Sequence, residues 1–142
     1  MGRSCVILLD THVVIWSAAD DARLGTKACD KIAASSLSNP FHVSAISAWE
    51  TAMLVNRGRL DLGEPAVDWL AKAMKHEAWK AIPIDAAIAV EAVNLPGSFH
   101  NDPADRFIVA TARLNGWALL TADRAILDYS RAGHVKAVDA GL

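Results

Sequence analysis

Four carboxylates stand at positions where an α/β fold would bring them together. Asp10 directly follows an apolar run, and Asp123 lies just past the apolar stretch 117–121. Glu50 and Asp105 each fall in the first turn or so of an expected helix. Clustered carboxylate oxygens are suited to hard divalent cations such as Mg²⁺ or Mn²⁺ rather than to zinc. We therefore predict a metal site formed by Asp10, Glu50, Asp105 and Asp123.

Helical spacing supports this prediction for Glu50. Ile46, Trp49 and Met53 recur on the face of the expected helix that also carries Glu50. A carboxylate on an apolar face is costly unless it is paired or binds a cation. No Lys or Arg nearby in the sequence offers Glu50 an obvious partner.

Helix capping is the simpler interpretation of the other acidic residues. Asp and Thr side chains are common N-caps, and acids in a first turn favour the helix dipole. The residues that fit this interpretation are Asp10, Asp102, Asp105, Thr121 and Asp123. Capping does not account for Glu50, nor for four acids converging on one place, so the metal site is the preferred hypothesis, with Asp102 taken as a cap.

The elements that must position these acids alternate between strand and helix. Strands are expected at about 4–9, 41–43, 81–84, 117–121 and 135–138. Helices are expected at about 11–19, 26–37, 47–56, 65–77, 86–93, 102–115 and 124–131. Pro83 assigns its strand to a sheet edge. Such alternation predicts a parallel sheet covered by helices on both faces, with its functional site where the strands end.

Composition sets the broad class. The 142 residues are 53% hydrophobic, with a net charge of −2, and are expected to form a single domain, residues 1–142. Two cysteines are too few for a disulfide framework or a Cys-based zinc site. No apolar run approaches the length of a membrane span, so a cytoplasmic protein without membrane contacts is expected.

Four stretches of this chain resemble one family. They are Leu8-Leu9-Asp10-Thr11-His12, Ser44-Ala45-Ile46-Ser47-Ala48-Trp49-Glu50, His100-Asn101-Asp102-Pro103-Ala104-Asp105-Arg106 and Leu119-Leu120-Thr121-Ala122-Asp123. In order and spacing they resemble the PIN-domain ribonucleases of the VapC toxin type, from bacterial toxin–antitoxin pairs. The resemblance extends from Val6 to about Val138.

This resemblance implies a fold and an activity. The fold would be a three-layer α/β/α sandwich with a short parallel sheet. The activity would be that of a Mg²⁺-dependent endoribonuclease, with Mn²⁺ as a possible substitute, which hydrolyses RNA with a metal-activated water. The chain would be the toxin of a type II pair, a homodimer inhibited by a VapB-like antitoxin.

The resemblance also suggests roles for individual residues. The metal-binding and catalytic acids would be Asp10, Glu50, Asp105 and Asp123, supported by the hydroxyl of Thr121. Arg106 and Arg124 follow proposed ligands and are expected either to contact RNA or to form structural ion pairs. The sequence assigns no definite role to His12 and His100, which lie next to the site. Arg57 and Arg59 flank Gly58 at a helix end, where they could either contact RNA phosphates or form a solvated last turn.

Two other functions stay open at this stage. A Mg²⁺-dependent phosphatase could use Asp10 as a covalent nucleophile, although that chemistry usually needs a second Asp two residues on, where this chain has His12. A non-catalytic PIN domain could bind only RNA or protein, but the presence of all four acids argues against it.

Overall fold

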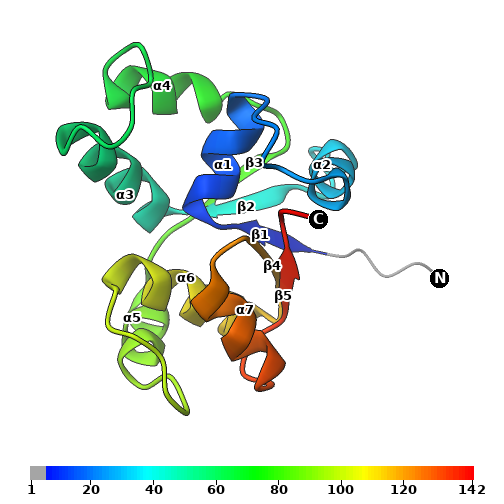
Figure 1. Ribbon diagram of the computed structural model, residues 1–142, viewed down its shortest axis with the longest axis vertical. Helices are drawn as coiled ribbons and strands as arrows, with labels where there is room; N and C mark the ends of the chain where they lie inside the picture. Colours follow the sequence, from blue (N-terminus) through cyan, green and yellow to red (C-terminus); the bar gives the residue numbers. More distant parts are fainter. Residues whose placement is uncertain (1–5) are drawn as a thin grey trace.

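A single parallel sheet forms the centre of the molecule. The computed structural model describes residues 6–142, whose five strands lie in the order β3-β2-β1-β4-β5 (Figure 1). The strands are β1 (Ile7–Leu9), β2 (Phe41–Ser44), β3 (Trp79–Ile82), β4 (Ala118–Thr121) and β5 (Ala137–Asp139). All neighbouring strands pair in parallel, and β1 lies in the middle.

Helices cover both faces of this sheet. They are α1 (Thr11–Ala18), α2 (Thr26–Ala33), α3 (Ala45–Asn56), α4 (Ala66–Ala73), α5 (Ala86–Val93), α6 (Pro103–Asn115) and α7 (Arg124–Arg131). Figure 1 shows α1 to α4 above the sheet and α5 to α7 below it. The expected α/β/α sandwich is confirmed. Among residues 6–142, no helix combines the length and apolar character needed to cross a membrane.

The side-chain alternation of the central strands separates two cores. Leu8 and Leu119 are fully buried in a cluster with residues of α5, α6 and α7. Ile7, Leu9 and Leu120 point to the opposite face, into a cluster that includes residues of α1 and α2. Strands that are apolar on both faces are typical of a parallel sheet buried between helices.

The strand order creates a crevice at one edge. From β1 the chain adds β2 and β3 on one side, whereas β4 and β5 lie on the other. The order therefore reverses between β1 and β4, and open α/β sheets bind ligands outside the carboxyl ends of strands at such a point. Asp10 comes directly after β1, and Asp123 lies two residues after β4.

Polar caps begin four helices at this same edge. The side chains of Asp10, Ser44, Asp102 and Asp123 accept backbone N–H hydrogen bonds at the starts of α1, α3, α6 and α7. These bonds satisfy donors that a helix leaves free in its first turn. The capping interpretation of Asp10, Asp102 and Asp123 is thus confirmed, and for Asp10 and Asp123 it coexists with a place in the acid cluster.

Several expected boundaries are wrong by a few residues. Helix α2 ends at Ala33 rather than near residue 37, because a turn follows in which Ser36 and Asn39 exchange backbone hydrogen bonds. Helix α4 ends at Ala73 rather than near 77, because the following turn is closed by the His76 ring, which accepts from the N–H of Ala78. Helix α3 begins at Ala45, two residues early, once Ser44 caps it.

Strand boundaries also differ from expectation by about two residues: β3 spans Trp79–Ile82 rather than about 81–84. The edge position of the strand near Pro83 is confirmed, since β3 is the outermost strand and ends at Ile82, just before that proline. Strand β5 begins two residues later than expected. Ser4 and Cys5, where the sequence predicts the start of the first strand, lie outside the described residues.

Candidate active site

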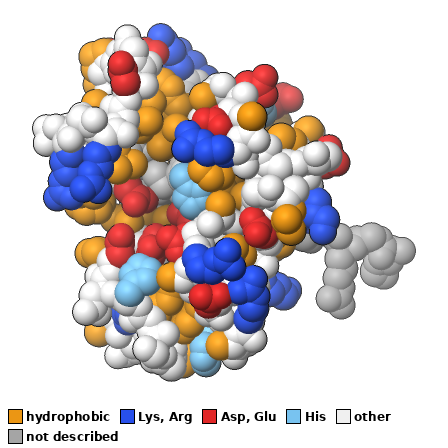
Figure 2. Space-filling view, in the orientation of Figure 1, with side chains coloured by type: hydrophobic (Ala, Val, Ile, Leu, Met, Phe, Trp, Pro, Cys, Tyr) orange, Lys and Arg blue, Asp and Glu red, His pale blue; other side chains and the backbone are white. Residues whose placement is uncertain are grey.

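The four predicted acids gather in one hollow. Figure 2 shows acidic side chains in a depression between the upper and lower halves of the molecule. Burial is the largest cause of the raised pKa values of Glu50 and Asp105, and the negative charges of Asp10 and Asp123 raise both further. The side chains of the four acids therefore lie near one another. We call these four residues the acid cluster.

Asp10 lies at the floor of the cluster, where a hydroxyl group and a backbone amide fix its carboxylate. It is only 2% exposed. The Thr121 hydroxyl donates to its Oδ2 over 2.7 Å, and the N–H of Thr11 donates to its Oδ1 over 2.8 Å. The same Thr121 hydroxyl accepts the backbone N–H of Asp123 at 3.0 Å. One side chain of β4 therefore fixes the carboxylate of Asp10 and the backbone of Asp123.

Burial dominates the electrostatics of Asp10. Desolvation raises its pKa, and the nearby Asp123 charge adds to the rise, while His12 and the hydrogen bonds act in the opposite sense. Nδ1 of His12 lies 3.7 Å from Oδ2 of Asp10, and its Nε2 accepts the N–H of Ala122 at 2.9 Å. His12 is therefore a hydrogen-bonding histidine that ties α1 to the end of β4.

Glu50 enters the hollow from the second turn of α3. Burial raises the pKa of its carboxyl, the hydroxyl of Thr11 lowers it, and the charges of Asp10, Asp102 and Asp123 raise it further. The apolar face expected around Glu50 is only partly formed. Ile46 packs against the core, whereas Trp49, which belongs to the same apolar pattern, is 50% exposed.

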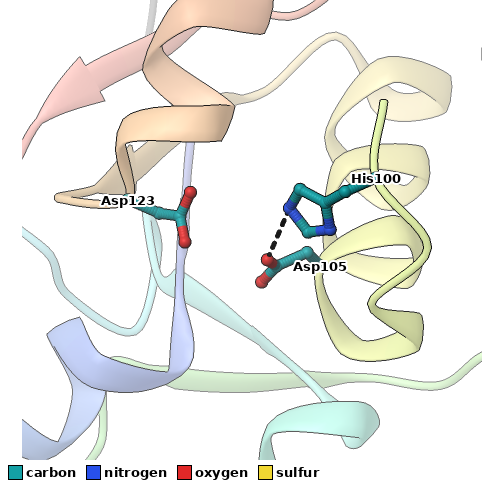
Figure 3. Close-up of side chains that lie close together, drawn as sticks. All are labelled: His100, Asp105 and Asp123. Carbon is teal, nitrogen blue, oxygen red and sulfur yellow. Dashed lines mark ion pairs between the residues drawn. The ribbon is translucent and has the colours of Figure 1, made fainter. Parts of the chain in front are cut away.

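The pKa of Asp105 is strongly perturbed. It lies in the first turn of α6 and is 8% exposed. Burial, followed by the charges of the neighbouring acids, raises its pKa to about 8. Nε2 of His100 lies 3.1 Å from its Oδ2 (Figure 3). No Lys or Arg forms an ion pair with any member of the acid cluster in the described part of the chain.

This donor set fits a divalent cation. His100, Asp105 and Asp123 each offer one ligand atom, and these three atoms lie within 4.8 Å of one another. Asp10 and Glu50 add negative charge around this group. Carboxylates that are buried without a cationic side chain gain most from a bound metal ion. Asp102, by contrast, is an exposed N-cap on the rim.

Arg106 does not form the structural ion pair that was one of its two expected roles: among residues 6–142 it has no carboxylate partner. Its Nε donates to the carbonyl of Ala92 at 2.7 Å, and its Nη2 donates to that of Val93 at 3.2 Å. Its Nη1 donates to the carbonyls of Phe99 and His100, each at 3.0 Å. The guanidinium thus binds four backbone carbonyls, a role that residue spacing does not reveal. Arg124, beside Asp123, is exposed, as are Arg57 and Arg59, which lie just past the C-terminal end of α3.

The sequence does not predict the contacts that two further residues, Thr11 and His100, make with the acid cluster. Thr11 contacts both Asp10 and Glu50, and its hydroxyl lies 2.9 Å from that of Ser47, which links α1 to α3. His100 contacts Asp105 from the preceding loop. Each residue lies close in the sequence to one of the acids, but this closeness does not predict which atoms are in contact.

Comparison with known proteins identifies the class that this fold and site define. Residues 7–132 match the model of the PIN domain. The chain therefore belongs to the PIN-domain family. Ribonuclease VapC22 of Mycobacterium tuberculosis is similar to it, with 39% identity over 120 residues, which cover 84% of this chain and 88% of that protein.

Solved structures share the fold at lower sequence identity. The VapBC2 complex of Rickettsia felis, bound to a promoter DNA fragment, aligns with a TM-score of 0.68 and 14% identity over 94% of this chain and 97% of that chain. FitAcB of Neisseria gonorrhoeae aligns with a TM-score of 0.65 and 19% identity, covering 95% and 98% of the two chains. A toxin–antitoxin complex of Klebsiella pneumoniae aligns with a TM-score of 0.61 and 21% identity, covering 94% of this chain and 97% of that chain.

Proposed function

We propose that this PIN-domain protein is a Mg²⁺-dependent endoribonuclease and the toxin of a type II toxin–antitoxin pair. The observation that carries the proposal is the convergence of Asp10, Glu50, Asp105 and Asp123 at the topological switch point without a Lys or Arg partner among residues 6–142. The similarity to a protein named as a ribonuclease supports the choice of RNA as substrate.

The acid cluster would hold the cation. Asp105 and Asp123 would provide the nearest oxygens, with Asp10 and Glu50 completing the negative environment. A divalent cation bound there offsets the charge of a phosphodiester and lowers the pKa of a water molecule. Mn²⁺ prefers similar oxygen ligands and is expected to substitute.

Other groups of the chain would orient the acids and bind the phosphate backbone of the RNA. Thr121 and the backbone N–H of Thr11 keep both oxygens of Asp10 oriented. The N-termini of α1, α3, α6 and α7 all face this edge, and the positive ends of helix dipoles favour a bound phosphate. Arg124, exposed at the first position of α7, would contact the RNA backbone beside Asp123.

The geometry of Asp10 argues against the phosphatase alternative. A covalent nucleophile must reach the phosphorus atom, yet Asp10 is 2% exposed and both its oxygens already accept hydrogen bonds. A binding-only protein would have no use for Asp10, Glu50 and Asp105, whose pKa values are raised by burial and by neighbouring acids, because such a cluster destabilises the fold.

Cleavage of RNA by the purified protein tests the proposal. We expect cleavage with Mg²⁺, none with EDTA, and ends that carry a 5′-phosphate and a 3′-hydroxyl. Asp10→Asn and Asp123→Asn should each abolish cleavage while circular dichroism shows a folded protein. Cleavage at the wild-type rate by either variant, in a preparation free of other nucleases, would remove that residue from the mechanism.

The proposed partner is a small antitoxin. Fold similarity to toxin–antitoxin complexes supports this partner. The negative hollow suggests that the antitoxin places a basic side chain there, and a cytoplasmic location follows from an RNA substrate. Co-expression with the adjacent reading frame should yield a complex without nuclease activity. A chain that elutes alone, as a monomer, from such a co-expression would contradict both the antitoxin and the expected homodimer.

A further inference from the structure

The ring of His100 is held on three sides. It lies in the loop between α5 and α6, and its Nδ1 is 3.2 Å from the backbone N of Asp102. The ring stacks on Phe99, with centroids 4.4 Å apart and planes at 28°. Its Nε2 points at Oδ2 of Asp105, 3.1 Å away (Figure 3). A histidine with this many contacts has a defined orientation relative to the acid cluster.

The backbone of Asp102 selects the tautomer of this ring. A peptide N–H can only donate, so Nδ1 of His100 accepts and carries no proton. The ring proton of the neutral histidine is then on Nε2, the atom that faces Asp105. In a metal-binding histidine the ligating nitrogen is deprotonated. His100 is therefore arranged to donate a hydrogen bond to a ligand of the metal ion, not to bind the ion through Nε2.

Arg106 fixes the loop that carries this ring. Its guanidinium binds the carbonyls of Phe99 and His100 in the loop, and those of Ala92 and Val93 at the end of α5. Four charge-assisted hydrogen bonds from one planar group leave the loop little freedom. The histidine is thus anchored through its own backbone carbonyl as well as through its ring.

We propose that His100 is a positioning residue of the metal centre: its Nε2–H holds Oδ2 of Asp105 and so presents the other oxygen of that carboxylate to the cation. This inference rests on the proposed function, since it assumes that Asp105 is a ligand. Hydrogen bonds from outer groups orient metal-binding carboxylates, and removing them typically lowers metal affinity by about 10- to 100-fold.

Nitrogen NMR of the intact, metal-free protein tests the tautomer. Two-bond ¹H–¹⁵N spectra distinguish the Nε2–H form from the Nδ1–H form, and the signal of His100 is assigned by its loss in His100→Gln. We expect the Nε2–H form at neutral pH. A ring protonated on Nδ1 would overturn the proposal, because Nε2 would then be free to bind metal.

A Mn²⁺ titration tests whether His100 affects the metal affinity of the site. Binding is measured by the decrease of the EPR signal of the free ion. His100→Ala should weaken Mn²⁺ binding about tenfold. His100→Gln, whose side-chain amide can donate from nearly the same place, should recover most of the affinity. His76→Ala is the matched control, because His76 also accepts a backbone N–H two residues ahead, at 3.1 Å, but belongs to the turn between α4 and β3. It should bind Mn²⁺ as the wild type does.

The outcomes separate this inference from the proposed function. If Asp123→Asn binds Mn²⁺ as tightly as wild type, the proposed metal site itself is wrong. If Asp123→Asn loses binding but His100→Ala does not, only the positioning role is overturned. Directly coordinated ¹⁴N in the pulsed EPR spectrum of the Mn²⁺-bound wild type, absent from His100→Ala, would also overturn it, since His100 would then be a ligand.

Saturating metal provides a further readout. A residue that acts through metal binding should matter less when Mn²⁺ is in excess, so the RNA cleavage rate of His100→Ala should approach that of wild type. A deficit that persists unchanged at saturating Mn²⁺ would show that His100 acts on the RNA, which contradicts a purely positioning role.

Discussion

The hydroxyl of Thr121 donates to Oδ2 of Asp10 at 2.7 Å, although 111 residues separate the two in the sequence. The bond spans the switch point between β1 and β4. Thr121 is fully buried, and the same oxygen accepts the N–H of Asp123. It therefore couples the two acids that flank the crevice.

Thr121→Val removes this hydroxyl with almost no change of shape. Asp10 and the N–H of Asp123 would each lose a buried partner, so we expect the free energy of unfolding to fall by about 1–3 kcal/mol. Cation affinity should fall as well. Urea denaturation in EDTA and Mn²⁺ titration measure the two effects. Thr121→Ser keeps the hydroxyl and should stay much closer to wild type; equal losses in the two variants would assign the effect to packing.

Glu50→Gln removes one charge from a crowded acid cluster. Because burial and neighbouring acids raise the pKa of Glu50, its ionised form is unfavourable in the metal-free protein. We expect a higher Tm than wild type in EDTA and a smaller gain from Mg²⁺. For wild type, Mg²⁺ at a hundredfold excess over its Kd raises the free energy of unfolding by about 2.7 kcal/mol. A variant that melts below wild type in EDTA, yet gains as much from Mg²⁺, would exclude Glu50 from a strained metal site.

Asp105 should make the stability of the metal-free protein depend on pH. Its pKa rises from 3.8 to about 8 on folding, so the folded chain retains a proton that the unfolded chain releases. The free energy of unfolding should therefore fall as the pH rises from about 4 to about 8. The groups that face Asp105 are Asp10, Glu50, His100, Asp102 and Asp123.

Melting curves in EDTA across that range measure the slope. Asp105→Asn cannot titrate and should lose much of the slope, whereas Asp61→Asn, at an exposed position, should keep it. Protons and metal compete for the same carboxylate, so Mn²⁺ affinity of wild type should rise over the same range. An Asp105→Asn variant with the full wild-type slope would mean that other acids carry the titration.

Arg106→Lys tests the loop anchor. An ammonium group cannot reach four carbonyls that a planar guanidinium binds from three nitrogens, so we expect a loss of about 2 kcal/mol in the free energy of unfolding. Arg131→Lys is the control, because Arg131 forms a surface ion pair with Asp128 that contributes little. Similar urea midpoints for the two variants would contradict the anchoring role.

The position of the acids could be predicted from sequence because it depends on a general rule. In a parallel sheet, a residue just after a strand and a residue in the next helix's first turn reach the same edge. Asp10 and Asp123 satisfy that rule, and the strands that precede them are apolar enough to recognise. Asp105 reaches the same edge for another reason: it lies in the first turn of α6, the helix that leads back into β4.

The environment of the acids could not be predicted in the same way. His100 reaches Asp105 because Arg106 folds the preceding loop back onto α5, and those bonds connect residues 6 to 14 positions apart with no periodic pattern. Trp49 follows the apolar pattern of α3 yet is half exposed, because periodicity gives the face of a helix but not what covers it.

The pairing of β1 with β4 also determines at what point during its synthesis the chain can form the acid cluster. Asp10 is synthesised early, but Asp105, Thr121 and Asp123 emerge from the ribosome only near the end of translation. At about 5–20 residues per second, several seconds separate the two events. Until β4 pairs with β1, a nascent chain has no complete acid cluster and so, by the proposed function, no nuclease activity. The proposed nuclease therefore becomes active only when translation is almost finished.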